Sequence, residues 1–322
     1  MDPNALTDPA PCEPPPRPTA HRRCLRGVCM CLFMFLVVLT AAARSDGRNR
    51  FLSYSGNEGL SVFIDASAFW ADDYSSGFYS GIDGNANTIY RVLHSQRDGT
   101  DIWYHLKSNG LIDASIGTCD DLTVEEFPSM YYRSAFMIGL GLHYTYRNGF
   151  GWLLRFDIAK MEAAGAFNLA NSKSTTVLNQ NHYIRCGMLG EEQRIYIDLA
   201  ITKEVDISPW LNLEVDLGLN VNNTKVSTNA MEIAGRTWSI LDVWDGQSPY
   251  VGIGEYEYVN QGGLGYGVFM AAYLGYRVEG LGAVKLGYSC HHTRTNLKGY
   301  EAMGWHHQLA LRFEVNNFSF FS

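Results

Sequence analysis

Apolar and polar residues alternate along much of this chain beyond about residue 59. Between residues 211 and 221, every second residue is Leu or Val, and the residues between them are Asn, Glu, Asp, Gly and Asn. Because successive side chains of a β-strand point to opposite faces, this pattern predicts a strand with one apolar and one charged face. The pattern recurs and predicts eight strands, at residues 60–70, 131–146, 150–162, 193–206, 210–226, 265–278, 282–294 and 303–315.

The connections between the predicted strands alternate in length. Three are short turns, at Arg147-Asn148-Gly149, Ile207-Ser208-Pro209 and Glu279-Gly280-Leu281. The others are longer, at residues 71–130, 163–192, 227–264 and 295–302. Short and long connections therefore lie at opposite ends of an antiparallel sheet, as the periplasmic turns and extracellular loops of outer-membrane barrels do.

The apolar face of a barrel points inward in a soluble protein and outward in a membrane protein. The strands here are 11 residues or longer, against about 5–6 in soluble proteins. Aromatic residues such as Trp70, Tyr132, Trp152 and Trp210 lie near strand ends, as they do at membrane interfaces. We therefore expect an all-β fold: an antiparallel eight-stranded transmembrane up-and-down β-barrel with long extracellular loops, the first of them partly helical.

The polar face of the strands then lines the lumen, and it carries both signs of charge. An eight-stranded barrel is just wide enough for side chains to fill it, and buried charges must pair to offset their lost hydration. We interpret these charges as a structural network that plugs the barrel, with a narrow channel as the alternative. The predicted network comprises Asp65, Arg133, Arg155, Asp157, Asp198, Glu214, Asp216, Arg277, Lys285, Arg312 and Glu314.

The first residues of the chain have the features of a signal peptide. A basic cluster around Arg22 and Arg23 precedes an apolar run that ends in Ala41-Ala42-Ala43. The run is shorter than the ~20 residues of a membrane-spanning helix, and its small-residue end is typical of a cleaved leader. We predict a signal peptide with an extended n-region at 1–43, a short periplasmic lead-in at 44–59 and the outer-membrane barrel at 60–322.

Composition and charge narrow the classes of function. The chain has 32 Gly, 13% aromatic and 18% charged residues, which suits strands and turns better than a helical bundle. A net charge of −8 without a basic patch argues against a nucleic-acid partner. Beyond the leader only Cys119, Cys186 and Cys290 remain, too widely spaced for a zinc motif. The first two can form a disulfide in an oxidising compartment, although their spacing does not show it.

The architecture of residues 60–321 resembles that of the eight-stranded OmpA-like outer-membrane barrels, including the many barrel proteins of Bacteroidota-type bacteria. The resemblance implies location in the outer membrane of a Gram-negative cell, in contact with its lipids and lipopolysaccharide. It also implies insertion by the outer-membrane assembly machinery, which reads a terminal aromatic strand. This chain ends in Phe318-Ser319-Phe320-Phe321-Ser322.

One stretch suggests enzymatic chemistry. Residues 290–296, Cys-His-His-Thr-Arg-Thr-Asn, resemble the His-x-Ser-Asn segment of the lipid A deacylases, eight-stranded barrels with a Ser–His–Glu site. The resemblance makes His291 and Thr293 a base and nucleophile pair, with Glu301 the only nearby carboxylate. Thr replaces the expected Ser, and strand parity points both residues into the barrel, whereas that family works at the lipid-facing surface. The two interpretations are therefore a lipid A-modifying hydrolase and a polar rim at the level of the lipid headgroups.

Four histidines lie on the last two predicted strands, at His291, His292, His306 and His307. A metal site needs three or four converging ligands. Strand parity places only His291 and His306 inside the barrel, so at most two of the four converge. We expect neither a metal nor another cofactor.

The long connections offer the largest surface for binding. In 71–130, apolar residues recur at helical spacing from Ile89 to Leu111, which predicts one or two short amphipathic helices over the barrel mouth. In 227–264, aromatic side chains lie among carboxylates, which suits a protein or glycan partner or the packing of loop on loop. These aromatic residues are Trp238, Trp244, Tyr250, Tyr256 and Tyr258. We expect a non-enzymatic barrel that anchors or displays surface loops for adhesion, envelope integrity or a partner complex.

Overall fold

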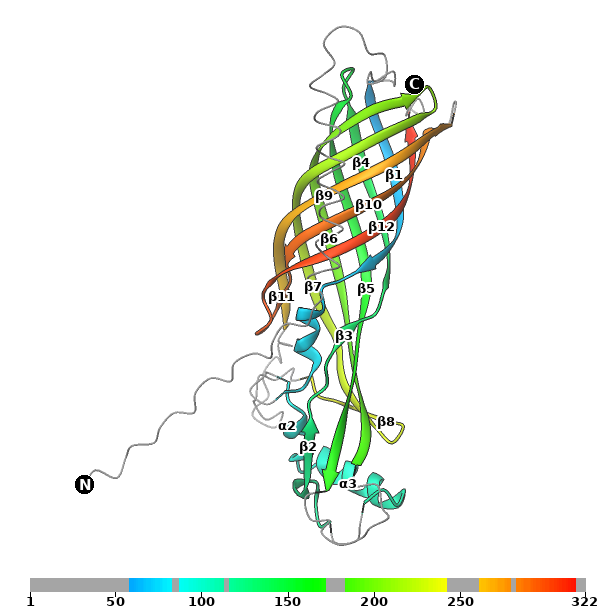
Figure 1. Cartoon of the computed structure of the whole chain (residues 1–322). Coiled ribbons are helices and arrows are strands. Elements are labelled where there is room, and N and C mark those ends of the chain that lie inside the picture. The colour runs from blue at the N-terminus through cyan, green and yellow to red at the C-terminus, as the bar shows by residue number, and fades with distance from the viewer. Residues whose placement is uncertain are drawn as a thin grey trace, which may run out of the picture.

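The computed structural model describes residues 58–82, 87–112, 116–171, 183–241, 261–278 and 282–316. The predicted signal peptide, at 1–43, lies outside the described residues, as does most of the predicted lead-in. The described chain consists mainly of antiparallel strands, with short helices near one end (Figure 1). Within these residues, no helix has both the length and the apolar character that crossing a bilayer requires.

Eight strands pair in a closed ring. Each pairs antiparallel with the next along the chain, and the last pairs with the first, from Ser61 opposite Asn316 to Trp70 opposite His307. A ring leaves none of these strands as a free edge, which confirms the predicted eight-stranded barrel. The strands are β1 (Gly59–Trp70), β4 (Ala135–Thr145), β5 (Phe150–Asn171), β6 (Tyr183–Ser208), β7 (Leu211–Ile233), β9 (Gly262–Val278), β10 (Gly282–Arg294) and β12 (Met303–Asn316).

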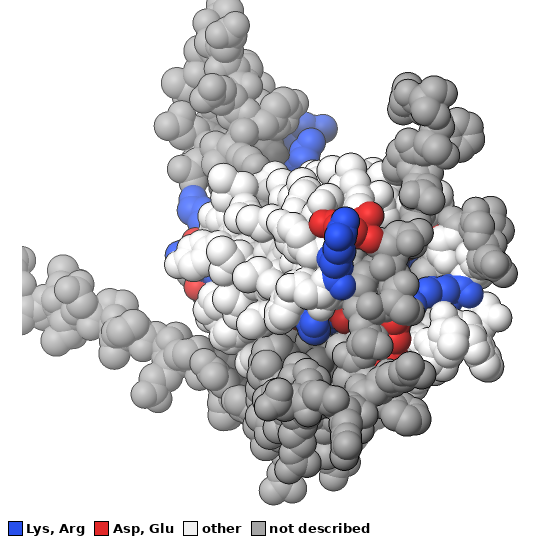
Figure 2. Space-filling model, turned by 90° about the horizontal axis from the view of Figure 1, so that it is seen from above, with Lys and Arg blue, Asp and Glu red and all other residues white. Residues whose placement is uncertain are grey.

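The short turns between β4 and β5 and between β6 and β7 lie at one end of the barrel, and the helices lie beyond the other (Figure 1). In the turn between β4 and β5, Gly149 has a φ of 75°, a left-handed conformation that glycine adopts without strain. Figure 2 looks onto the end with the short turns, where charged side chains occupy only a few places on a largely uncharged surface. Following the orientation expected from the loop lengths, we refer to this end as the periplasmic end, and to the other as the outer end.

The barrel wall has an apolar outside and a polar inside. Outward side chains such as Leu199 and Leu219 are 55% and 63% exposed, whereas the alternating Asp198 is completely buried. A soluble barrel has the opposite polarity, and this one is typical of barrels that span a membrane. Phe63 and Phe69, two aromatic residues on the polar face of β1, are buried inside the barrel.

The polarity of the wall reverses at about residue 160 of β5. Beyond this level the outward Lys160 forms an ion pair with Glu191, at 3.2 Å between Nζ and Oε2. The inward side chains of β5 become apolar, and Met161, Phe167 and Leu169 are buried. An apolar inside and a charged outside suit water, so the outer boundary of the membrane lies near this level.

Three strands are longer than the sequence predicted. β5, β6 and β7 continue beyond the ring into residues that we assigned to the loops 163–192 and 227–264. There they extend a sheet whose other strands are β2 (Leu122–Glu126), β3 (Tyr131–Tyr132) and β8 (Arg236–Ser239). The predicted strand 131–146 is interrupted between β3 and β4, and β11 (Asn296–Leu297) pairs with β9.

The projecting sheet and the helices form what we call the cap, residues 71–82, 87–112, 116–132, 161–171, 183–192 and 227–241 (Figure 1). Its helices are η2 (Asp73–Tyr79), α2 (Ile89–Leu93), α3 (Asp98–Ser108) and η3 (Cys119–Asp121). Thr88 caps α2 by accepting a hydrogen bond from the backbone N–H of Arg91. The predicted helical character of the first long connection is therefore confirmed. The largest cluster of buried apolar side chains in the described structure lies mostly in the cap, with part of it at the adjacent barrel mouth.

Candidate functional site

The centre of the lumen is organised by Arg155 of β5. Its Nη2 lies 2.5 Å from Oδ2 of Asp198, and its Nε lies 3.0 Å from Oδ2 of Asp157. Its Nη1 donates to the hydroxyl of Tyr273 at 2.9 Å. Asp198 also accepts a hydrogen bond from the side-chain amide of Asn220. These contacts tie β5, β6, β7 and β9 together across the lumen.

A second guanidinium, that of Arg312, lies between two aromatic rings. Its central carbon is 4.1 Å from the ring centre of Phe63 and 4.0 Å from that of Tyr273. Its nitrogens bind Asp65 at 3.0 Å and Glu214 at 2.8 Å. Aromatic faces and carboxylates both stabilise a desolvated guanidinium, which explains an aromatic residue on the polar face of β1.

Three lumen side chains form a set that could hold a metal ion. The ligand atoms of His143, Glu214 and Glu314 lie within 4.8 Å of one another, and we call them the lumen carboxylate cluster. Lys285 forms ion pairs with both glutamates, at 2.5 Å from its Nζ to Glu314. The ammonium group therefore occupies the position between the carboxylates that a metal cation would take.

The described lumen carries more negative than positive charge. Inside the barrel, buried carboxylates outnumber the buried or partly buried Lys and Arg side chains nine to five. Neither carboxylate oxygen of Asp216 accepts a hydrogen bond within the described structure. The nine carboxylates are Asp65, Asp157, Glu192, Asp198, Glu204, Asp206, Glu214, Asp216 and Glu314, and the five cations are Arg155, Arg194, Arg277, Lys285 and Arg312.

The outer mouth of the lumen is closed by η2. Tyr79 is completely buried, and its hydroxyl donates to Oε2 of Glu192 at 2.6 Å. The ring packs against Gly190, where an added Cβ would lie 2.3 Å from it. Burial and the nearby carboxylate of Glu192 raise the pKa of Tyr79 well above its usual value, so the phenol stays protonated. Buried side chains thus fill the barrel from the periplasmic end to the cap.

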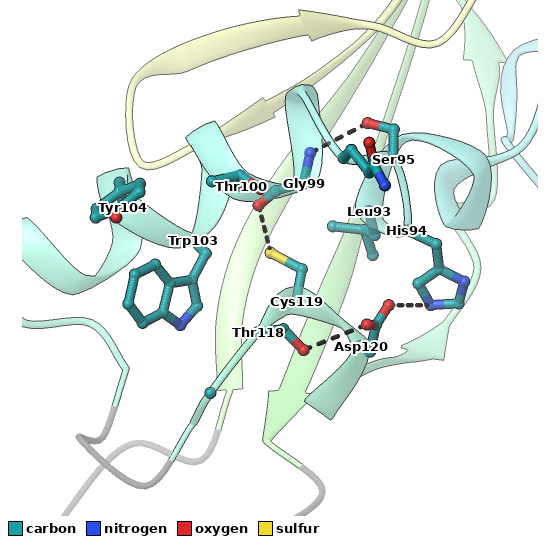
Figure 3. Close-up of a pocket in the computed structure, with 12 residues that line it drawn as sticks. Leu93, His94, Ser95, Gly99, Thr100, Trp103, Tyr104, Thr118, Cys119 and Asp120 are labelled. Carbon is teal, nitrogen blue, oxygen red and sulfur yellow. Dashed lines mark hydrogen bonds and ion pairs between the residues drawn. The ribbon is translucent and has the colours of Figure 1, made fainter.

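The cap contains a pocket of about 300 Å³, which Figure 3 shows. It lies between the corner that joins α2 to α3 and the segment that carries η3. The indole N–H of Trp103 donates to the backbone carbonyl of Ile116 at 3.0 Å, and Cys119 donates to the carbonyl of Gly99 at 3.1 Å. At the rim, Nε2 of His94 lies 3.7 Å from Oδ1 of Asp120.

The structure places the predicted network residues in the lumen, with one exception. Arg133 lies in the break between β3 and β4, where its side chain is 56% exposed and pairs with Glu162 at 3.3 Å. The prediction that it belongs to the lumen is wrong, because the strand alternation does not continue through this break. At the periplasmic end, Arg277 pairs with Glu204 at 2.8 Å and with Asp206 at 2.6 Å.

The candidate catalytic residues do not meet at a lipid-facing surface. His291 and Thr293 are buried in the lumen, and Nε2 of His291 lies 3.3 Å from Oδ2 of Asp198. Glu301 is exposed, in the connection beyond β11. His306 is buried inside the barrel, whereas His292 and His307 are only partly buried on its outward face.

For Trp238 and two of the cysteines, the structure decides between the alternatives that the sequence left open. Trp238 of β8 is buried and donates to Asp101 of α3 at 3.1 Å, so it packs within the cap. Cys119 and Cys186 are free thiols that do not form a disulfide. Four further aromatic residues of the long connection lie outside the described residues, namely Trp244, Tyr250, Tyr256 and Tyr258.

The pocket residues were not predicted as a site. Trp103 belongs to the helical pattern of 71–130, but that pattern indicates only which residues share a helix. The segment with Cys119 and Asp120 is brought to α3 by the fold of the cap, and no local signal in the sequence indicates this contact.

No family model and no curated protein matches the chain. Among solved structures, it is similar to Neisserial surface protein A, at 12% identity and a TM-score of 0.35 over 82% of this chain and 100% of that one. It is similar to the outer membrane protein OprG from Pseudomonas aeruginosa, at 7% identity and a TM-score of 0.35 over 81% of this chain and 99% of that one. It is also similar to Ail, the attachment invasion locus protein of Yersinia pestis, in complex with the heparin analogue sucrose octasulfate. That match has 10% identity and a TM-score of 0.31 over 80% of this chain and 100% of that one. The fold described above rests on the strand pairing of this chain, which closes eight strands into a ring.

Proposed function

We propose that this protein is a non-enzymatic outer-membrane barrel that holds the cap on the outside of a Gram-negative cell as a binding surface for adhesion or for a partner complex. The observation that supports this best is the reversal of wall polarity near residue 160. Below that level the outward side chains are apolar, which suits contact with lipid. Above it, the same strands have a charged outer surface and an apolar interior, which suits contact with water.

The continuity of β5, β6 and β7 supports a display function. These three strands run from the membrane wall into the cap as single strands, with an irregularity in the β6–β7 pairing at Glu191–Glu192, and β6 alone spans 26 residues. At about 3.3 Å per residue, such a strand is far longer than the ~25 Å apolar band of an outer-membrane barrel. The excess length serves to hold the cap in a fixed position above the lipid surface.

The filled lumen supports an anchor over a channel. Ion pairs cross the lumen at Arg155 and Arg312, and η2 covers the outer mouth. The burial of His291 and Thr293 in the same lumen argues against hydrolysis of a lipid, because the wall separates them from the acyl chains. In planar bilayers we therefore expect no conductance from the purified protein, and stable single-channel steps would contradict a closed anchor.

The orientation can be tested in intact cells with an impermeant maleimide. Ser108 in the cap and Asn148 in a short turn are both exposed, and the native cysteines 119, 186 and 290 are buried. We expect Ser108→Cys to be labelled in intact cells and Asn148→Cys only after permeabilisation. Labelling of the Asn148→Cys variant alone in intact cells would contradict the proposal, as would recovery of the protein from the soluble periplasmic fraction. The predicted cleavage near Ala43 is tested by the mass of the mature chain.

A further inference from the structure

The pocket of the cap has the features of a preformed binding site. Trp103 is held by its hydrogen bond to Ile116, and Cys119 by its hydrogen bond to Gly99. An added Cβ at Gly99 would lie 2.1 Å from the carbonyl oxygen of Leu93, so the start of α3 packs tightly against the end of α2. A ligand would find these groups already in place, which lowers the entropic cost of binding.

The lining of the pocket combines an apolar floor with neutral polar groups. Leu93, Trp103 and the Cys119 thiol provide apolar surface, and burial raises the pKa of that thiol to about 12, which keeps it uncharged. Thr100 and Thr118 add hydroxyl groups near the rim. Of the lining residues, Asp120 is the one carboxylate, and no Lys or Arg lines the pocket.

These properties match the surface of a neutral sugar. A pyranose has apolar C–H faces that pack on aromatic rings, and a ring of hydroxyl groups that pair with side chains such as Asp120, His94 and Thr118. A sulfated or phosphorylated group would meet the Asp120 carboxylate and no cation among the lining residues; Lys107, which is not one of them, holds its ammonium over the Trp103 ring, 4.4 Å from the ring centre. The volume of about 300 Å³ is at the lower end of small-molecule sites, enough for one or two sugar units.

We propose that the pocket formed by α2, α3 and the segment 117–120 binds a neutral saccharide, with Trp103 as the aromatic platform and Asp120 as a hydrogen-bond acceptor for its hydroxyl groups. The proposal rests on the proposed function, in which the cap faces the outside of the cell. It adds the chemical class of the ligand and the residues that contact it (Figure 3).

The test uses the full-length protein in detergent micelles on an array of neutral hexose and N-acetylhexosamine oligosaccharides, with heparin fragments as sulfated comparators. We expect binding to neutral glycans, and we expect Trp103→Ala to weaken it by about tenfold or more. Asp120→Asn, which keeps the shape of the side chain, should weaken it by about threefold to tenfold. Tyr183→Ala is the matched control, since Tyr183 is 53% exposed in the cap and does not line the pocket.

Three results would overturn the proposal: no neutral glycan binds, Trp103→Ala binds as the wild type does, or only heparin fragments bind. Gel migration of unboiled samples shows whether each variant keeps the folded barrel, and Trp103→Phe retains a ring if the Ala variant does not fold. The surface labelling of Ser108→Cys is independent of this result. A failure of the saccharide proposal is therefore distinguishable from a failure of the surface-display proposal.

Discussion

Replacing Asp198 or Asp216 by Asn should have very different effects on stability, although both carboxylates are completely buried in the lumen. The two substitutions make the same chemical change and keep the same shape. Asp198 accepts hydrogen bonds from Arg155 and Asn220, whereas neither oxygen of Asp216 accepts a hydrogen bond within the described structure. Comparing the two variants therefore distinguishes buried carboxylates that stabilise the barrel from buried carboxylates that contribute little to its stability.

The magnitudes follow from the contacts of each carboxylate. Asp198 lies 2.5 Å from Nη2 and 3.0 Å from Nε of Arg155, and it also accepts a hydrogen bond from Asn220. Removing one partner from such a buried pair costs about 3–5 kcal/mol. Asp216 accepts no hydrogen bond within the described structure, and its ion pair with Arg312 is 3.9 Å long.

For Asp216, attraction and desolvation nearly cancel. At an effective dielectric constant near 20, a pair at this distance gains about 4 kcal/mol. Burial of the ion costs several kcal/mol, and the neighbouring carboxylates add repulsion. We therefore expect Asp216→Asn to change the free energy of unfolding by less than about 1 kcal/mol in either direction, including a small stabilisation.

The assay is equilibrium unfolding in urea of the protein inserted in lipid vesicles, followed by tryptophan fluorescence and by gel migration without boiling. The difference between the two variants should be about 3 kcal/mol or more, with Asp198→Asn the less stable. Equal destabilisation of both variants would refute the reasoning, because it would mean that the hydrogen bonds and ion pairs of Asp198 contribute nothing beyond burial of a carboxylate.

Three further predictions concern the mouth, the lumen and the cap. Gly190→Ala places a Cβ within 2.3 Å of the Tyr79 ring and should expose η2 to protease. Gly187→Ala is the control, because its Cβ would lie 3.6 Å from the nearest atom and should leave cleavage unchanged. Equal cleavage rates for the two variants would contradict the closure of the mouth by η2. Lys285→Met should destabilise the barrel by about 3–5 kcal/mol, and Zn²⁺ should restore part of the unfolding midpoint by binding the lumen carboxylate cluster, whereas an unchanged midpoint would rule out that geometry. The raised pKa of Cys119, about 12, leaves roughly 10⁻⁵ of the thiol ionised at pH 7. Iodoacetamide should therefore modify Cys119 rapidly only after unfolding, and the slow rate in the native protein should rise about tenfold for each pH unit until the pH reaches the pKa. Rapid modification of the native protein at pH 7 would contradict the prediction, because it would show that the thiol is accessible and ionised.

The strands of the barrel could be predicted because the membrane imposes a strict alternation. Outward residues within the lipid-facing band must be apolar, so stretches such as 135–145 and 211–221 have a strong period of two. The structure has strands at these residues, and parity also placed Asp65, Asp157 and Arg312 correctly on the inward face.

The extension of the strands into the cap was missed because the phase of the alternation changes there. In β5, the apolar residues at 154, 156 and 158 face outward, and those at 161, 167 and 169 face inward. The change shifts the apolar positions from even to odd numbers at the level where water replaces lipid. A search for one continuous apolar face ends at that point, and this signal, a shift of one residue with continued alternation, could have found the longer strands.

The partners of each lumen charge could not be predicted, because parity gives the face of a residue but not its height or its neighbour across the barrel. Arg155 and Asp198 are opposite in the register of β5 and β6, but Arg312 and Glu214 meet only because the ring closes. The pocket of the cap depends likewise on contacts between segments that are far apart in the sequence. Such contacts are fixed by tertiary packing and leave no local pattern.

The contacts that fill the lumen also fix the positions of the strands that carry the cap. A barrel that conducts needs an open interior, and here the interior is filled by ion pairs and hydrogen bonds that join β1, β5, β6, β7, β9 and β12. The same contacts fix the three long strands relative to one another at the level of the membrane. Since those strands continue as the sheet of the cap, we expect a loss of order in the lumen to reach the cap. A substitution that loosens the lumen, such as Asp198→Asn, should therefore increase proteolysis of the cap as well as lower the stability of the barrel, and Asp216→Asn should do neither.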